Sequence, residues 1–127
     1  MNETGMTAAK SPSAFAALGL GAELLRAIDD LGFQQPTPVQ VAAIPAILRG
    51  GDLWASAMTG SGKTAAFVLP ILQRLAARRH GLQRTIPIHG LLLAPTRELA
   101  VQTAETIRIL GAHLPSPPKT WFHAELP

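Results

Sequence analysis

Eight consecutive residues near the middle of the chain have the types and spacing of a phosphate-binding loop. They run Ala57-Met58-Thr59-Gly60-Ser61-Gly62-Lys63-Thr64. Backbone N–H groups around Gly60 and Gly62 can point into one concavity, and the helix that follows adds the positive end of its dipole. Lys63 would then reach the outer phosphates of a nucleotide, and Thr64 would offer its hydroxyl to Mg2+. The predicted ligand is a nucleotide with its magnesium ion.

The loop departs from the usual pattern at one position and has a simpler interpretation. The pattern begins with Gly, whereas here the first residue is Ala57. In the simpler interpretation, Gly60 and Gly62 only mark a turn between a strand and a helix, and Lys63 is a solvated residue of the first helical turn. A lysine in that turn opposes the helix dipole, which favours a bound anion.

A strand and a helix must hold this loop between them. The apolar run Leu53–Ala57 predicts the strand, with Trp54 as a packed core aromatic, and residues 62–79 predict the helix. A second strand is predicted over 86–94, because its centre, 91–94, is apolar at every position. Such a strand is covered on both faces, as in parallel sheets with helices on each side.

The order of these elements predicts an α/β fold. A polar stretch at 80–84 separates the first helix from the second strand, and a helix predicted over 97–110 is ended by Gly111. Strands alternating with helices predict an open parallel sheet flanked by helices. Ligands of such sheets bind beyond the carboxyl ends of the strands, where the loop and Pro95-Thr96-Arg97 would both lie.

Two helices are predicted ahead of the loop. The first spans 22–31 and has Gly32 placed for a left-handed cap. The second spans 38–49, with Thr37 at its N-cap and Pro38 in its first turn. We expect Pro45 to kink this second helix. Its predicted buried residues are Val41, Ile44, Ile47 and Leu48.

Composition sets broad limits. The 127 residues are 47% apolar and contain no Cys, which excludes disulfides and thiolate metal sites. The four histidines lack the close pairing of metal ligands, so we expect them at the surface; they are His80, His89, His113 and His123. The net charge of +3 is a mild bias, and the basic stretch over 74–84 suits a solvated helix end as well as an RNA contact. With no signal-type or membrane-length apolar run, a cytoplasmic location is expected.

Three segments differ in character. Residues 1–12 are small and polar and predict a flexible tail, residues 13–114 carry the folded portion, and residues 115–127 contain four prolines and predict an irregular ending.

Three motifs in this order resemble those of the DEAD-box ATP-dependent RNA helicases. Gly32-Phe33-Gln34-Gln35-Pro36-Thr37-Pro38-Val39-Gln40, preceded by Phe15, is similar to the Q motif of that family. The phosphate-binding loop is similar to its motif I, and Pro95-Thr96-Arg97-Glu98-Leu99-Ala100 to its motif Ia. The resemblance covers about 15–111 and implies the N-terminal part of a RecA-like domain that binds ATP, Mg2+ and RNA.

The resemblance also implies roles for single residues. Gln40 would recognise adenine through its side-chain amide, Phe15 would pack near the base, and Thr37 would support the motif. The remaining residues of the implied ATP site are Phe33, Thr59, Gly60, Ser61, Gly62, Lys63 and Thr64. As alternatives, Gln40 would be a solvated residue of a first helical turn, and Phe15 a hydrophobic anchor.

The implied RNA surface comprises Pro95, Thr96 and Arg97, which would contact the RNA backbone without reading its sequence. As an alternative, Thr96 and Glu98 form only a capped helix start.

The chain departs from the family pattern in two ways. Met58 stands where the family usually has Gln, and no Asp-Glu pair follows Lys63, so the D-E-A-D motif and all later motifs are missing. We therefore expect this polypeptide to bind ATP without hydrolysing it, as a truncated or frame-shifted product. Two strands also cannot complete a sheet, which predicts aggregation or partial disorder. Rival interpretations are a different P-loop ATPase or kinase, and a non-enzymatic nucleotide- or RNA-binding module.

Overall fold

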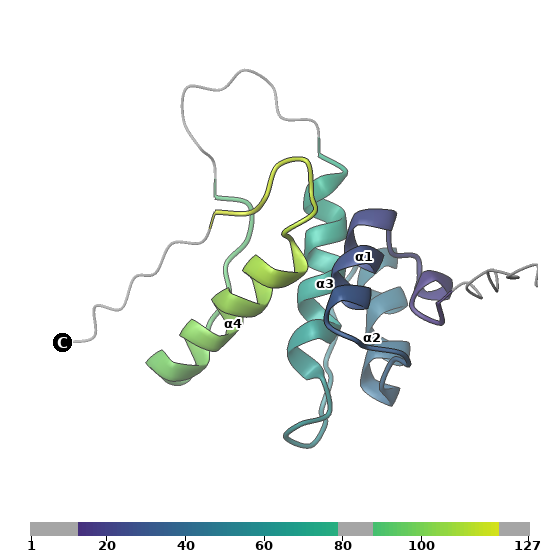
Figure 1. Ribbon diagram of the computed structural model, residues 1–127. Coiled ribbons are helices and arrows are strands. Elements are labelled where there is room, and N and C mark those ends of the chain that lie inside the picture. The colour runs from purple at the N-terminus through teal and green to yellow at the C-terminus, as the bar shows by residue number, and fades with distance from the viewer. Residues whose placement is uncertain (1–12, 79–87, 120–127) are drawn as a thin grey trace, which may run out of the picture.

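Four α-helices and one short 3-10 helix form the computed structural model, which describes residues 13–78 and 88–119 (Figure 1). In chain order the elements are η1 (Ala16–Leu18), α1 (Ala22–Asp30), α2 (Pro38–Arg49), α3 (Lys63–Ala76) and α4 (Arg97–Leu110). The predicted tail at 1–12, the polar stretch at 80–84, His80, His123 and the last part of the proline-rich ending lie outside the described residues.

The helix boundaries follow the capping residues of the sequence. Helix α2 has the predicted bounds, with Thr37 at the N-cap and Pro38 in the first turn, and it continues through Pro45. Helix α4 also has the predicted bounds, because the Thr96 hydroxyl accepts a hydrogen bond from the Leu99 N–H at 3.2 Å. After α1, Gly32 adopts the predicted left-handed conformation, with φ of 75°.

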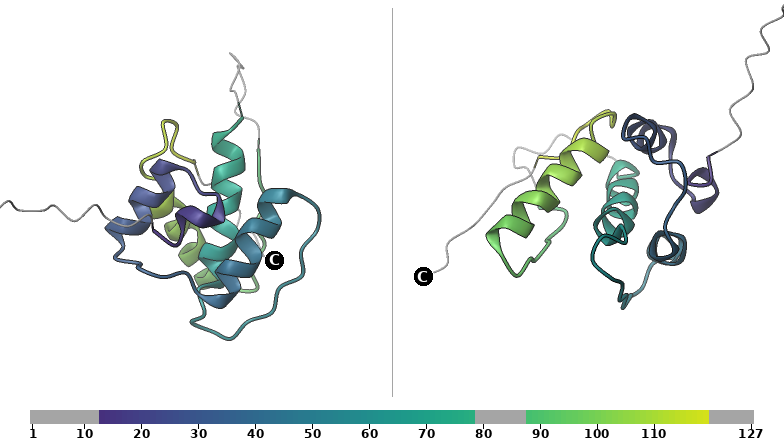
Figure 2. Two further views of the ribbon diagram at one scale, coloured as in Figure 1. Left: turned by 90° about the vertical axis from the view of Figure 1, so that its right-hand side faces the viewer. Right: turned by 60° about the horizontal axis from the view of Figure 1, so that its bottom comes forward.

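Helix α3 is the centre of the molecule. It packs against α2 on one side and α4 on the other, and α1 also contacts α4 (Figures 1 and 2). Its buried face carries Ala65, Val68, Leu69 and Leu72. The other elements contribute Phe15, Leu20, Leu24, Ile28, Ile44, Leu110 and Leu114 to the same core. The core of the described residues therefore forms between helices, without a sheet.

The two predicted strands are wrong for the residues that the structure describes. Residues 53–57 and 88–94 have no regular secondary structure, and neither is hydrogen-bonded into a ladder. A strand needs a neighbour about 4.8 Å away, and Figures 1 and 2 show the two segments apart. The described part of the chain is therefore helical, and the predicted parallel sheet is absent from it.

Without a sheet, several apolar side chains predicted to be buried are exposed. Trp54 is 95% exposed, so its assignment as a core aromatic is wrong. Leu91 and Leu93 are also exposed, because no described helix or strand covers their segment. On α2, Val41 is exposed and Ile44 is fully buried. The faces that would have been covered by neighbouring strands therefore lie open.

Two polar contacts join elements that are distant in sequence. His113 Nε2 lies 2.6 Å from Asp30 Oδ2, which ties the turn after α4 to the end of α1. The Gly21 N–H donates to Gln73 Oε1 at 2.7 Å, which ties the start of α1 to α3. His113 keeps 25% of its side chain exposed beside Asp30, and His89 is exposed, so both lie at the surface as predicted.

No helix in the described ranges is long and apolar enough to cross a membrane.

Candidate nucleotide-binding site

The loop before α3 has the backbone that its glycines allow. Gly60 and Gly62 both have φ of 81°, a left-handed conformation that side chains disfavour. The Ser61 N–H donates to the Met58 carbonyl at 3.2 Å, which closes the turn. Helix α3 begins directly afterwards, and no side chain caps its first turn. Its first N–H groups and its positive dipole end are therefore available to an anion.

Lys63 is the first residue of α3, and its side chain is exposed. The first turn of this helix contains no acidic residue that would offset the lysine. Thr64 follows and is half-buried. The loop thus combines backbone donors, one cation and one hydroxyl within a short stretch of chain, which is the donor set that binds phosphate.

Gly62 has a second reason to lack a side chain. The Gln40 Nε2 donates to the Gly62 carbonyl at 3.1 Å, which brings the two motifs into direct contact. A Cβ on Gly62 would collide with the Gln40 amide and would lie 3.3 Å from Thr37 Oγ1. The first turn of α2 therefore packs against the phosphate-binding loop, with the Gln40 side chain on the Gly62 backbone.

Gln40 is buried, with 3% of its surface exposed, so the alternative of a solvated residue is wrong. Its Oε1 accepts from the Thr37 N–H at 3.0 Å while its Nε2 donates to the loop. A side-chain amide has two N–H donors and two acceptor lone pairs. After these bonds, each end of the Gln40 amide retains one position, which is the donor and acceptor combination that an adenine edge requires.

Two hydroxyls beside this contact have no hydrogen-bond partner among the described residues. They are Thr37 Oγ1 and Ser61 Oγ, and both atoms are buried. A buried polar group without a partner costs about 1–3 kcal/mol. Both residues belong to the nucleotide site predicted from the motifs, and their unpaired oxygens are consistent with a polar ligand or water nearby.

A hollow of about 280 Å³ lies beside the loop. Its walls include Phe33, Gly62 and Thr64, so the structure gathers three of the predicted site residues. Phe33 is 44% exposed there. The other walls include Leu31 and Ala65, and also three residues of α4 that sequence reasoning missed, namely Thr106, Ile109 and Leu110. Only their helical spacing of three and four residues signals a shared face.

Phe15 does not line this hollow. It is 1% exposed and packs in the core cluster, while its N–H donates to Ser13 Oγ at 3.1 Å. This packing is that of the hydrophobic anchor given as its alternative role.

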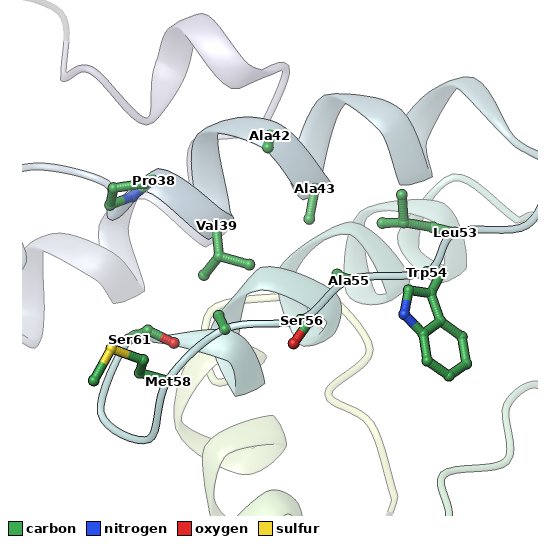
Figure 3. Close-up of a pocket in the computed structure, with 11 residues that line it drawn as sticks. Pro38, Val39, Ala42, Ala43, Leu53, Trp54, Ala55, Ser56, Met58 and Ser61 are labelled. Carbon is green, nitrogen blue, oxygen red and sulfur yellow. The ribbon is translucent and has the colours of Figure 1, made fainter.

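A second, larger hollow of about 570 Å³ lies between α2 and residues 53–58 (Figure 3). Leu53 points toward α2, whereas Trp54 points away from it, the alternation of an extended chain. Val39 and Ala43 line the α2 side. This hollow is largely apolar, and it extends from the predicted strand to Met58 and Ser61 of the phosphate-binding loop.

The motif Ia residues lie at the opposite end of α4 from the 280 Å³ hollow. Pro95, Thr96 and Arg97 are all exposed. The Thr96 hydroxyl is engaged in the helix cap, which confirms that this segment is a capped helix start. Arg97 remains at the surface as a cation that an RNA backbone could meet.

Comparisons with known proteins agree with these motifs. Residues 37–121 match the family model described as DEAD/DEAH box helicase. The chain therefore belongs to the DEAD-box RNA helicase family. It is 55% identical over 100 residues to the human probable ATP-dependent RNA helicase DDX49, a match that covers 79% of this chain and 20% of that protein. To the Escherichia coli K12 ATP-dependent RNA helicase DeaD it is 47% identical over 106 residues, covering 84% and 16%.

Solved structures show the same relationship. The RNA helicase Prp28 from Chaetomium thermophilum bound to ADP matches with a TM-score of 0.73 at 37% identity, covering 86% of this chain and 26% of that one. Dbp5 from S. cerevisiae, bound to RNA and ADP BeF3, matches with a TM-score of 0.67 at 37% identity, covering 80% and 25%. The described helices are thus arranged as in part of a DEAD-box RecA-like domain, and the chain spans about a fifth of the length of its curated relatives.

Proposed function

We propose that this chain binds ATP through the loop at 57–64 and through Gln40, as the nucleotide-binding part of an ATP-dependent RNA helicase. The observation that carries the proposal is the hydrogen bond from Gln40 Nε2 to the Gly62 carbonyl. This bond supports the proposal because a side-chain amide is able to recognise adenine and the glycine-rich loop is able to hold phosphates. By the family resemblance, this combination separates DEAD-box helicases from other P-loop proteins.

The loop residues fit a nucleotide with Mg2+. Lys63 is exposed at the start of an uncapped helix and would pair with the outer phosphates. The Thr64 hydroxyl is an oxygen donor of the kind that Mg2+ prefers, and bound magnesium would neutralise phosphate charge. The described residues hold no cluster of three His, Cys, Asp or Glu that could bind a metal alone. Phosphate oxygens and water would therefore supply the other ligands, as is usual for Mg2+.

RNA binding and hydrolysis form separate parts of the proposal. The exposed Arg97 at the start of α4 supports contact with an RNA backbone, and the structurally similar Dbp5 is bound to RNA in its own structure. No Asp follows Asp52 in the sequence. For the 127-residue polypeptide itself we therefore propose binding of ATP without turnover, because phosphoryl transfer in P-loop NTPases uses a further Asp to hold the metal.

A titration with fluorescently labelled ATP and GTP tests the nucleotide site. Wild type should bind ATP more tightly than GTP, since the guanine O6 would face the Gln40 acceptor. Gln40→Ala should lower the affinity for both nucleotides, because Gln40 also contacts the loop, and should bring the ratio of the two affinities close to one. Gln34→Ala is the matched control, because Gln34 belongs to the same segment and is exposed. A wild-type chain that binds neither nucleotide, or binds both equally, contradicts the proposal.

A further inference from the structure

Asp30 is the last residue of α1, and its charge opposes the dipole of that helix. A helix dipole favours cations in the last turn, whereas the last turn of α1 contains no basic residue. The Asp30 carboxylate instead has a partner 83 positions along the chain, since His113 Nε2 lies 2.6 Å from Asp30 Oδ2. A carboxylate can only accept a hydrogen bond, so the imidazole N–H is the donor. The contact with His113, and not the helix dipole, therefore favours an acid at this position.

A hydrogen-bonded cap joins the end of α1 to one wall of the 280 Å³ hollow. The Gly32 N–H donates to the Asp29 carbonyl at 2.9 Å, and the Phe33 N–H donates to the Ile28 carbonyl at 3.2 Å. With the left-handed Gly32, these two bonds form a Schellman cap. Leu31 and Phe33 belong to this cap and line the hollow. The position of the end of α1 therefore determines the position of this wall.

A second hydrogen-bonded turn joins His113 to another wall of the same hollow. The Leu114 N–H donates to the Gly111 carbonyl at 3.1 Å, and the Leu114 side chain is buried in the core. These contacts hold His113 beside the end of α4, where Ile109 and Leu110 line the hollow. The Asp30–His113 contact thus connects the two segments that carry these walls.

We propose that the hydrogen bond between Asp30 and His113 sets the separation of these two walls, and that both are positioning residues for nucleotide binding. The inference rests on the proposed function, because a nucleotide held at the loop would lie beside a hollow that Gly62 and Thr64 also line. Neither Asp30 nor His113 lines the hollow, so each acts through the wall to which it is joined. None of the described residues lining the hollow is charged. Its width therefore affects the uncharged part of a nucleotide more than the phosphates.

Two variants at position 30 separate positioning from an effect on the helix. In Asp30→Asn the side-chain amide oxygen can still accept from His113, whereas Asp30→Ala removes the acceptor. Both variants remove the charge that opposes the α1 dipole, and alanine favours a helix more than asparagine does. A role in helix stability alone therefore predicts that Asp30→Ala is the better variant, and the positioning role predicts the reverse. Glu23→Ala is the matched control, because Glu23 is an exposed acid in the first turn of the same helix.

Calorimetric titration of the 127-residue chain with ATP and with inorganic tripolyphosphate gives the readout. Asp30→Ala should raise the Kd for ATP about fivefold and should leave the Kd for tripolyphosphate within about twofold. Asp30→Asn and Glu23→Ala should keep both values within about twofold of wild type. Unchanged ATP binding by Asp30→Ala, an equal loss of both ligands, or an Asp30→Asn variant as weak as Asp30→Ala would overturn the inference and leave the proposed function intact. A wild-type chain that binds no ATP defeats both.

Exchanging the two residues provides a second test in the same titration. Asp30→His alone places two imidazoles opposite each other, and His113→Asp alone places two carboxylates there, so each single variant should weaken ATP binding. The double variant restores one donor and one acceptor and should recover the Kd for ATP to within about twofold of wild type. Such recovery is a coupling between the two positions. A double variant whose loss equals the sum of the two single losses would show that Asp30 and His113 do not act as a pair.

Discussion

Gln40 and Gly62, separated by 22 positions in the sequence, are joined by a hydrogen bond of 3.1 Å from side-chain amide to backbone carbonyl. The contact makes the helix before the loop and the loop itself a single unit. Glycine is required at position 62 for two reasons: the backbone there is left-handed, and the Gln40 amide approaches it closely.

Replacing Gly62 by alanine should therefore cost more than backbone strain alone. An alanine in the left-handed region loses about 1–2 kcal/mol, and at position 62 its Cβ would also displace the Gln40 amide. The matched control is Gly51→Ala, because Gly51 has φ of 90° and a Cβ there would have nothing within 4 Å. Urea unfolding followed by circular dichroism should show a larger loss for Gly62→Ala. Equal losses would mean that Gln40 moves aside without cost.

Lys63→Ala should separate binding from stability. Lys63 opposes the dipole of α3 and the helix start has no acidic residue in its first turn, so removing its charge should leave the melting temperature unchanged or slightly raised. The Kd for ATP should rise by about tenfold or more, since a charge-assisted contact with phosphate is lost. Labelled-ATP titration and thermal unfolding measure the two effects, with Lys119→Ala, an exposed lysine outside the loop, as control. A fall in both affinity and melting temperature would assign Lys63 a structural role.

Trp54→Ser should be nearly neutral for stability, because its side chain is 95% exposed and points away from α2. Surface substitutions usually change the free energy of unfolding by less than about 0.5 kcal/mol. Leu69→Ala, at a fully buried position on α3, is the contrasting variant and should cost about 2–5 kcal/mol. Chemical denaturation measures the free energy of unfolding of both variants. If Trp54→Ser lost as much stability as Leu69→Ala, Trp54 would have to be a core residue.

Arg97→Ala should weaken RNA binding and reduce its salt dependence. Each phosphate contact that is lost lowers the slope of log K against log salt by about 0.7–0.9. Arg108→Ala is a control on the same helix, because Arg108 Nε donates to Glu105 Oε2 at 3.0 Å and this bond lowers the pKa of Glu105. Fluorescence anisotropy with a single-stranded RNA at several salt concentrations measures the slope. Equal slopes for wild type and Arg97→Ala would remove Arg97 from the RNA surface.

Local sequence signals predicted the helices well, whereas strand pairing, which depends on residues distant in the sequence, was not predicted correctly. The start of α2 is determined by Thr37 and Pro38, and the start of α4 by the cap residue Thr96. Each of these signals involves only a few neighbouring residues. A strand at 53–57 needs a partner segment that is distant in the sequence, and local apolar character gives no information about such a partner. The prediction from apolar character alone therefore gave two strands that are absent from the described residues. The exposure of Trp54 follows from the same cause.

The candidate site shows the same division. The loop glycines and Gln40 were predicted from motifs. The residues of α4 that line the 280 Å³ hollow were not, because their position depends on how two helices cross, and their only trace in the sequence is a spacing of three and four residues. Phe15 lies in the core, and its contact with a base stays a prediction.

Helix α4 runs for 14 residues from Arg97 to Leu110, and at 1.5 Å per residue it is about 20 Å long. Thr96 at its start and Ile109 near its end are therefore too far apart for one small ligand to contact both.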